Sequence, residues 1–262
     1  MAEHLTHGWE PDTPADDSLV RTFLEGTAAR GEYFAALVGG RAARVNGVAL
    51  ADVNSPVWFE NTAVLMAPCE LLDRDATIAT ILDFYPRERH IVLFSAFATW
   101  DLSDAGFELM GHPPFMVRPA GGGPPPWPTA FEARPVETAE DAATFTRILE
   151  DAYPMPGARA AAMAQLSEYD GPMRLYNGYL GGEAVATAGA WVGDGLNDVG
   201  WISAMPSTRR KGVGAAITYA STVAEPEMPA VLISSDLGNR VYEALGYLTL
   251  FRMTLWHRPP TA

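Results

Sequence analysis

The chain has 262 residues, 48% of them hydrophobic, so it can bury a full core, and global disorder is excluded. It carries 18 Lys and Arg against 32 Asp and Glu, and this formal net charge of −14 argues against nucleic acid or an anionic membrane as a partner. The single cysteine, Cys69, permits no internal disulfide and indicates a reducing, cytoplasmic compartment.

The first 17 residues are polar and acidic, lack the apolar stretch of a signal peptide, and predict a flexible tail. His4 and His7 lie three residues apart, but no other His, Cys or acidic residue is spaced to complete a metal site, so we expect no bound metal. The longest strongly apolar run, residues 91–100, is far too short to span a bilayer.

Residues 18–118 predict a first domain of helices and strands. A helix is expected over residues 18–31, because Asp17 or Ser18 can accept hydrogen bonds as its N-cap. Apolar patterning then predicts a strand over 57–67, an amphipathic helix over 75–85, a buried strand over 91–98 and a short helix over 102–106.

Residues 119–129 predict a linker, because three glycines followed by three prolines favour an extended spacer over regular structure. A second domain is expected over 130–262. Its predicted strands cover 131–136, 173–180, 184–192, 230–235 and 247–256, and its predicted helices cover 138–152, 158–169, a segment ending near 224, and the segment around Tyr242. Thr138 with Asp141 three residues later resembles a capping box at the first of these helices.

The stretch from Val199 to Ala216 organises the second domain. Pro206, which has no N–H to donate, stops an apolar strand, and a basic triple (209–211), two glycines (Gly212 and Gly214) and a helical pattern follow. The first N–H groups of a helix lack internal partners, and glycines let a phosphate approach the backbone. The stretch therefore predicts a local anion site; a solvated turn before a helix is the alternative.

Two common phosphate loops do not fit this stretch. No Gly-x-x-x-x-Gly-Lys-Ser/Thr run exists, and Ile217 breaks the Gly-x-Gly-x-x-Gly/Ala fingerprint that Gly212 begins. Residues 209–214 instead resemble the Arg/Gln-x-x-Gly-x-Gly/Ala loop of the GNAT family of N-acetyltransferases. Residues 235–247 are similar to that family's closing segment, Ser-x-x-Gly-x-x-Val/Leu-Tyr-x-x-Leu-Gly-Phe/Tyr.

A weaker copy of the closing segment lies in the first domain. Leu102-x-x-x-Gly106-Phe107 with residues 114–117 resembles Leu245-Gly246-Tyr247 with residues 250–253, yet no Arg-x-x-Gly-x-Gly loop follows an apolar strand before residue 118. The resemblance implies an α/β chain (α+β, mixed sheet) of two GNAT-like domains in tandem, each a mostly antiparallel twisted sheet flanked by helices. The first domain would be degenerate, without its cofactor grip; an unrelated α/β domain is the alternative.

The resemblance also implies a site for acetyl-coenzyme A (acetyl-CoA), used as a co-substrate without a metal. In the family the loop grips the pyrophosphate, and the pantetheine arm bonds the preceding strand like an added strand. The residues implied for the pyrophosphate are Arg209, Arg210, Lys211, Gly212, Val213, Gly214 and Ala215, and those for the pantetheine arm are Ile202, Ser203 and Ala204.

Two residues are candidates for proton transfer. Tyr242 matches the family's general-acid tyrosine, whose phenol can protonate a departing thiolate; a core tyrosine is the alternative. Asp198 lies at the strand entrance, where some members carry a glutamate base; a hairpin-turn residue is the alternative. Residues that could line an acceptor pocket, or belong to the core, are Tyr153, Met155, Met163, Trp191 and Trp201.

The implied activity is direct transfer of an acetyl group from acetyl-CoA to an amine of a small-molecule acceptor, in a monomer or homodimer. The acidic composition suits a cationic amine. The alternative is a non-catalytic acyl-CoA sensor that keeps the loop, against which the retained Tyr242 counts.

Overall fold

The computed structural model describes residues 8–10, 13–14, 18–152 and 171–260. The first elements along the chain are α1 (Leu19–Leu37), β1 (Arg41–Val45), β2 (Val48–Asp52), β3 (Thr62–Leu65), α2 (Arg74–Phe84), β4 (Ile91–Ser95), β5 (Glu108–Gly111) and β6 (Pro114–Arg118). After the predicted linker come β7 (Phe131–Pro135), α3 (Ala139–Ala152), β8 (Met173–Leu180), β9 (Glu183–Gly193), β10 (Leu196–Ala204), α5 (Val213–Thr222), β11 (Ala230–Ile233), α6 (Asn239–Ala244), β12 (Leu248–Arg252) and β13 (Thr254–Arg258). No helix of the described ranges is long and apolar enough to cross a membrane.

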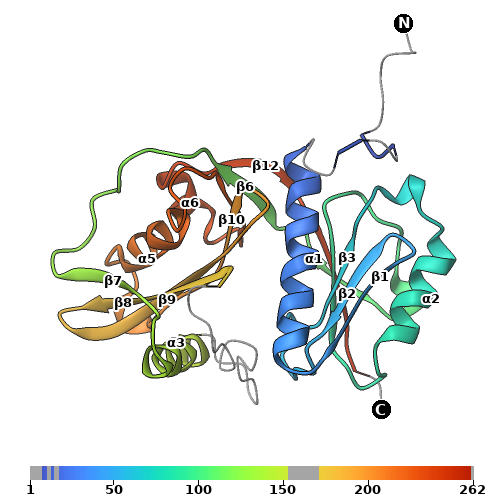
Figure 1. The fold of residues 1–262 in the computed structure, drawn as a ribbon, viewed down its shortest axis with the longest axis horizontal. Helices are drawn as coiled ribbons and strands as arrows, with labels where there is room; N and C mark the ends of the chain where they lie inside the picture. Colours follow the sequence, from blue (N-terminus) through green and yellow to red (C-terminus); the bar gives the residue numbers. More distant parts are fainter. Residues whose placement is uncertain (1–7, 11–12, 15–17, 153–170, 261–262) are drawn as a thin grey trace, which may run out of the picture.

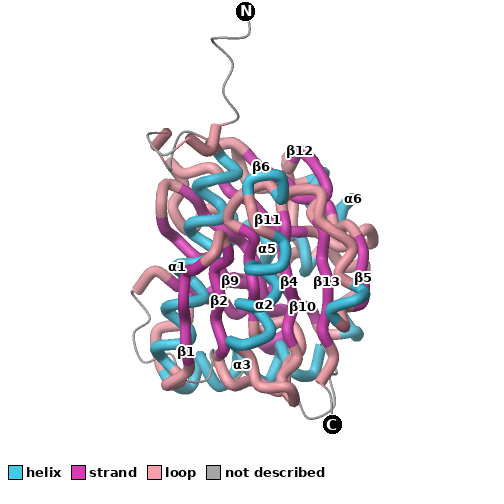
Figure 2. Tube along the Cα trace, turned by 90° about the vertical axis from the view of Figure 1, so that its right-hand side faces the viewer, coloured by secondary structure: helices cyan, strands magenta, loops and turns pink. Residues whose placement is uncertain are grey.

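The strands form two mixed sheets, and each sheet takes one strand from the other part of the chain. The N-terminal half has the strand order β1-β2-β3-β4-β13-β5, and the C-terminal half has the order β12-β6-β11-β10-β9-β8-β7. β13 lies between β4 and β5 (Figure 2), while β6 lies between β11 and β12. The predicted boundaries at 18–118 and 130–262 divide the chain into two consecutive segments. In the folded protein, however, each of these segments contributes one strand to the sheet of the other.

The two halves repeat one strand order. In each, one strand (β3 or β10) runs parallel to the next along the chain (β4 or β11), and the exchanged strand separates that next strand from an edge strand (β5 or β12). The C-terminal sheet has β7 as an additional strand at its other edge. The turns before the edge strands also match, because Gly106 and Gly246 have left-handed φ of 81° and 89° and Phe107 and Tyr247 are both buried. The mixed α/β fold and the internal repeat predicted from the sequence are confirmed.

Helix α1 lies between the two sheets (Figure 1). Phe23 packs in one buried cluster with Val64 of β3 and Val231 of β11, and Phe34 packs with Phe145 of α3 in another. The opposite face of the second sheet is covered by α5 through buried residues such as Val213. The N-terminal half therefore contributes its first helix directly to the face of the C-terminal sheet.

The predicted helix starts are confirmed by their caps. The Ser18 hydroxyl accepts a hydrogen bond from the Arg21 N–H (3.3 Å) at the start of α1. At the start of α3 the Asp141 N–H donates to the Thr138 hydroxyl (3.2 Å) and the Thr138 N–H donates to the Asp141 carboxylate (3.1 Å). The predicted helix over 158–169 lies outside the described residues.

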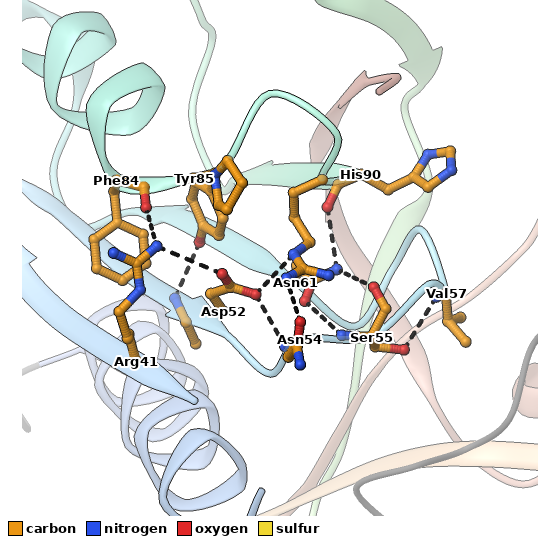
Figure 3. A network of polar contacts seen from close by, with 12 residues as sticks. Arg41, Asp52, Asn54, Ser55, Val57, Asn61, Phe84, Tyr85 and His90 are labelled. Atoms are coloured by element: carbon orange, nitrogen blue, oxygen red, sulfur yellow. Dashed lines mark hydrogen bonds and ion pairs between the residues drawn. The ribbon is translucent and has the colours of Figure 1, made fainter. Parts of the chain in front are cut away.

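The predicted strand over 57–67 is wrong for its first half, because only Thr62–Leu65 is strand. The side chains of Ser55 and Asn61 bond the backbone of this loop: the Ser55 hydroxyl accepts from the Val57 N–H (3.0 Å), and the Asn61 amide donates to the Ser55 and His90 carbonyls (2.9 and 3.1 Å; Figure 3). Such local bonds compete with a β ladder. At the start of the same loop, buried Asp52 pairs with Arg41 and Arg89 (3.6 and 3.0 Å).

The predicted final strand over 247–256 is also wrong, because the chain there crosses from one sheet to the other. β12 pairs with β6 and β13 pairs with β4 and β5, and between them the Met253 N–H donates to the Pro113 carbonyl (2.9 Å). The apolar pattern is continuous across the crossing, so it gives no sign of the change of partner. The β1–β2 hairpin was not predicted at all, although Asn46 and Gly47 at its turn, with φ of 50° and 71°, are a standard hairpin signal.

Candidate functional site

β10 and β11 are paired only near their starts. Asn197 lies opposite Ala230 and Asp198 opposite Val231, and in the described structure residues 199–204 of β10 have no partner on β11. β11 remains paired along its length with β6 on its other side. The two parallel strands therefore separate toward their carboxyl ends, the part of an α/β sheet where ligands bind. The open edge of β10 could pair with an extended ligand.

A bulge lies in β10 beside this opening. The register between β9 and β10 shifts between Gly200 and Ser203, and Trp201 has a left-handed φ of 51°. The Thr187 hydroxyl of β9 donates to the Trp201 carbonyl (3.2 Å) and lies 2.8 Å from the Ser203 hydroxyl oxygen. Gly189 leaves room for the indole, because a Cβ there would be 3.3 Å from Trp201 Cε3. β9 thus holds the bulge in place.

The predicted phosphate loop connects β10 to α5. Pro206–Thr208 forms one 3₁₀ turn, and left-handed backbone at Arg210 and Gly212 (φ 62° and 77°) turns the chain into the helix. Gly212 is the N-cap, with no side-chain hydrogen bond and no acidic residue in the first turn of α5. Among the described residues, nothing accepts a hydrogen bond from the N–H groups of residues 213–215, so they are open to an anion.

The glycines of the loop fit a ligand that approaches the backbone. A Cβ on Gly214 would meet no described atom within 4 Å, so packing does not require glycine there. Gly212 is needed for its positive φ, and a Cβ on it would lie 3.5 Å from the ring of Pro128, where the chain before β7 passes the loop. Residues 209–212 are exposed. Open donors, local positive charge and free space together suit a pyrophosphate.

Tyr242 lies on α6, which follows β11. Its ring is half-buried and 6.2 Å from that of Tyr247, edge to face. It packs on the same buried cluster as Ile202 of β10 and Ala215 of α5. Three stretches that are far apart in the sequence are therefore brought together on one side of the opening.

Asp198 is not at a hairpin turn but is buried within β10 and forms an ion pair with Arg30 of α1. Burial raises the pKa of the Asp198 carboxyl, and the charge and hydrogen bond of Arg30 oppose the rise. The Arg30 guanidinium also lies 5.4 Å from the centre of the Trp201 ring. The predicted base is therefore held by a cation from the N-terminal half.

Solved structures place this arrangement in a known fold. The chain is similar to a GCN5-related N-acetyltransferase from Kribbella flavida (TM-score 0.66, 23% identity, covering 89% of this chain and 96% of that one). It is also similar to a protein assigned to the GNAT family from Novosphingobium aromaticivorans (TM-score 0.59, 15% identity, 92% and 97% covered). A conserved protein of unknown function from Staphylococcus epidermidis matches as well (TM-score 0.59, 14% identity, 86% and 96% covered).

The chain has the GNAT fold. No family model and no curated protein sequence matches it. The coverage of both chains by the first two matches extends the GNAT likeness to both halves.

The GNAT fold brings most of the predicted site residues to one place. Ile202, Ser203 and Ala204 lie on the part of β10 that β11 leaves unpaired. Residues 209–215 form the loop and first turn of α5, and Tyr242 lies on the next helix. Ser203 is buried with its hydroxyl next to that of Thr187, which leaves its backbone rather than its side chain for a ligand.

Trp191 and Trp201 lie on the face of the sheet that packs against α1, opposite the face that α5 covers. Their rings are 5.3 Å from Tyr33 and 5.7 Å from Phe34, respectively. The other residues considered for an acceptor pocket, Tyr153, Met155 and Met163, lie outside the described residues. An aromatic wall built from both halves therefore adjoins the Arg30–Asp198 pair.

The sequence reasoning missed Arg30, Thr187 and Gly189. Arg30 is 168 residues away from Asp198, and nothing in the local helical pattern marks it. Thr187 and Gly189 interrupt an otherwise apolar strand, and a glycine within a strand can mark a close approach by another group. The glycine at position 189 could therefore have predicted that another group lies close to this strand.

Proposed function

We propose that the chain is an acetyl-CoA-dependent N-acetyltransferase whose acceptor is a small-molecule amine, acting as a cytoplasmic monomer or homodimer. The observation that carries the proposal is the uncapped start of α5. Its open N–H groups, the free space at Gly214 and the exposed basic triple adjoin an unpaired strand edge. The GNAT fold, in which this combination occurs, supports the assignment.

Acetyl-CoA would supply an acetyl thioester: a bond forms from the amine nitrogen to the carbonyl carbon, and the carbon–sulfur bond breaks. The amine must lose a proton, and the departing thiolate must gain one. We assign Tyr242 as the acid that protonates the thiolate, because its ring packs beside the residues that flank the opening. We assign Asp198 as the base that accepts the proton of the amine, because its buried carboxylate lies where β10 leaves β11.

The competing function is a sensor that binds acyl-CoA without transfer. The test is calorimetric titration with acetyl-CoA, combined with release of free thiol in the presence of a panel of amines. Micromolar binding together with thiol release supports an enzyme, binding without turnover supports a sensor, and absence of binding contradicts both.

Replacing Tyr242 with Phe removes one proton donor and keeps the ring. General acid catalysis is worth about 10²–10⁴-fold, and a thiolate is a tolerable leaving group, so kcat should fall by about 10²-fold. Acetyl-CoA affinity should stay within a few-fold. Tyr179→Phe, on β8 and stacked on Arg134, is the matched control and should leave kcat unchanged. Wild-type turnover by Tyr242→Phe would place the acid elsewhere.

A further inference from the structure

A buried ion pair joins the two halves at the candidate site. Arg30 of α1 and Asp198 of β10 are in contact, and their side chains are only 21% and 12% exposed. Among the described residues, Asp198 is the only hydrogen-bond acceptor of Arg30, and the bond uses one nitrogen, Nη1. A guanidinium has five N–H donors in a planar fork, so most of its bonding capacity is uncommitted.

The surroundings of the pair are aromatic rather than polar. Trp201 lies below the guanidinium, Phe34 is 5.7 Å from Trp201, and Tyr33 stands against Trp191. Moving two charges out of water costs several kcal/mol each, and well-packed apolar residues are often as stable as a buried ion pair. Stability of the contact between α1 and β10 therefore does not account for a charged pair on this face.

Two further costly features lie on the same face. Trp201 adopts a left-handed backbone conformation, which is strained for a bulky residue. The indole N–H of Trp191 is buried and has no hydrogen-bond partner among the described residues. Strained backbone and unpaired buried donors concentrate at binding sites, where the ligand or the reaction requires them.

The position of the pair matches the chemistry of an acceptor site. Asp198 is the last residue of β10 that pairs with β11, so the pair stands where the opening begins. It lies on the α1 face of the sheet, whereas α5 covers the other face. A molecule bound at the unpaired edge of β10 on this face would reach the opening from the side opposite α5.

We propose that the acceptor is an α-amino acid with an aromatic or large apolar side chain, an inference that rests on the proposed acetyltransferase function. Its carboxylate would bind the Arg30 fork, its ammonium would face Asp198, and its side chain would lie against Trp201, which is only partly buried. Adjacent positive and negative groups in direct contact are complementary to an ammonium and a carboxylate that one carbon atom separates.

The same arrangement supplies the proton balance of the transfer. The bound ammonium gives one proton through the Asp198 carboxylate to solvent and becomes a neutral amine, which is the nucleophilic form. After the amine attacks, Asp198 accepts the second proton that the nitrogen loses, while Tyr242 protonates the departing thiolate and is reprotonated from solvent. Burial, which raises the pKa of Asp198, makes it a better proton acceptor than an exposed aspartate. Arg30 would thus bind the acceptor and also keep Asp198 ionised until the amine arrives.

The test compares amino acids with amines that lack only the carboxylate. Phenylalanine is paired with phenethylamine and tryptophan with tryptamine, and both binding by calorimetry and acetyl transfer by thiol release are measured. A charge-assisted bidentate bond is worth enough for about a 100-fold difference in Kd and in kcat/KM in favour of the amino acids. Arg30→Met should abolish that difference by weakening only the amino acids, and Arg30→Lys should keep part of it.

Arg44→Met is the matched control, because Arg44 of β1 forms exposed ion pairs with Glu25 and Glu32 of α1, the helix that carries Arg30. This variant should leave the preference intact. Equal affinity of the wild type for both members of each pair overturns the inference, as does an equal loss for both in Arg30→Met, which would indicate a structural ion pair. Should Arg30→Met not fold, Asp198→Asn tests the other charge: it should lower turnover more than amino-acid binding. Failure to bind acetyl-CoA would instead overturn the proposed function, while amino-acid binding by calorimetry still tests the acceptor site.

Discussion

The equivalent helices α2 and α5 begin in opposite ways. The Asp73 carboxylate caps α2 by accepting a hydrogen bond from the Ala76 N–H (3.0 Å), and Asp75 lies in its first turn. α5 has only the backbone of Gly212 at that position and follows a basic triple. An anion would be repelled at the start of α2 and attracted at the start of α5. Two copies of one fold therefore differ in the charge at a single helix terminus.

The strands before these two helices also differ, because the strand pair is closed in the N-terminal half and open in the C-terminal half. β3 and β4 stay paired at three successive positions, to Val64 and Phe94, one residue before β3 ends, whereas β10 leaves β11 after Asp198. Trp9 covers the ends of β3 and β4: its indole N–H donates to the Met66 carbonyl (3.0 Å), and its ring lies 5.2 Å from Phe97. The predicted tail thus contains an anchored residue, and it lies where the C-terminal half has its opening.

The largest expected difference between the halves is in acetyl-CoA binding, which we expect in the C-terminal half and not in the N-terminal half. Acetyl-CoA should bind once per chain, because among the described residues only those of the C-terminal half combine an uncapped helix with an open strand edge. Calorimetric titration or native mass spectrometry gives the stoichiometry. Two molecules per chain at saturation would show that the cap and Trp9 do not close the N-terminal half.

Gly214→Val should weaken acetyl-CoA binding by at least about 100-fold, since it separates the phosphate from two backbone N–H groups whose charge-assisted bonds are worth about 1.5–3 kcal/mol each. The fold should persist, because the new side chain meets no described atom within 4 Å at its Cβ. Gly123→Val in the linker, also in open space, is the control. Unchanged affinity in the Gly214 variant would remove the loop from the site.

The N-terminal half has a long loop between β2 and β3, where the C-terminal half has a tight turn between β9 and β10. This loop contains Glu60, and burial raises the pKa of the Glu60 carboxyl to about 7. The folded state then holds a proton that the unfolded chain, with a pKa near 4.5, releases, so stability should fall as the pH rises from about 4.5 to 7. Glu60→Gln should remove this loss, worth up to about 3 kcal/mol at pH 8. Urea unfolding at pH 5 and pH 8 measures it; an equal pH dependence in both proteins would contradict it.

Trp9→Ala should lower the free energy of unfolding by about 2 kcal/mol, through lost contacts and one lost hydrogen bond. Trp9→Phe keeps most of the ring contact with Phe97 and should cost about 1 kcal/mol. Acetyl-CoA affinity should not change in either, because the residue covers the other half. A change in affinity would show that Trp9 acts on the C-terminal site.

Much of this site could be predicted because its parts are local. The loop at 209–214 and the helix after it depend on neighbouring residues, and the capping residues Ser18 and Thr138 act within one turn. Arg30 and the strand exchange could not be predicted, because they depend on contacts between segments far apart in the chain. Neither leaves a periodic pattern in the sequence.

The exchange of β6 and β13 has a consequence for how the protein is made. β5 joins its sheet only through β13, so the ribosome must synthesise residues 254–258 before that edge can form. The N-terminal sheet can therefore form β1 to β4 early, but it stays incomplete until this strand has been made. For the same reason, a cut in the linker at 119–129 would leave two fragments that each hold a strand of the other, and they should stay together until denatured.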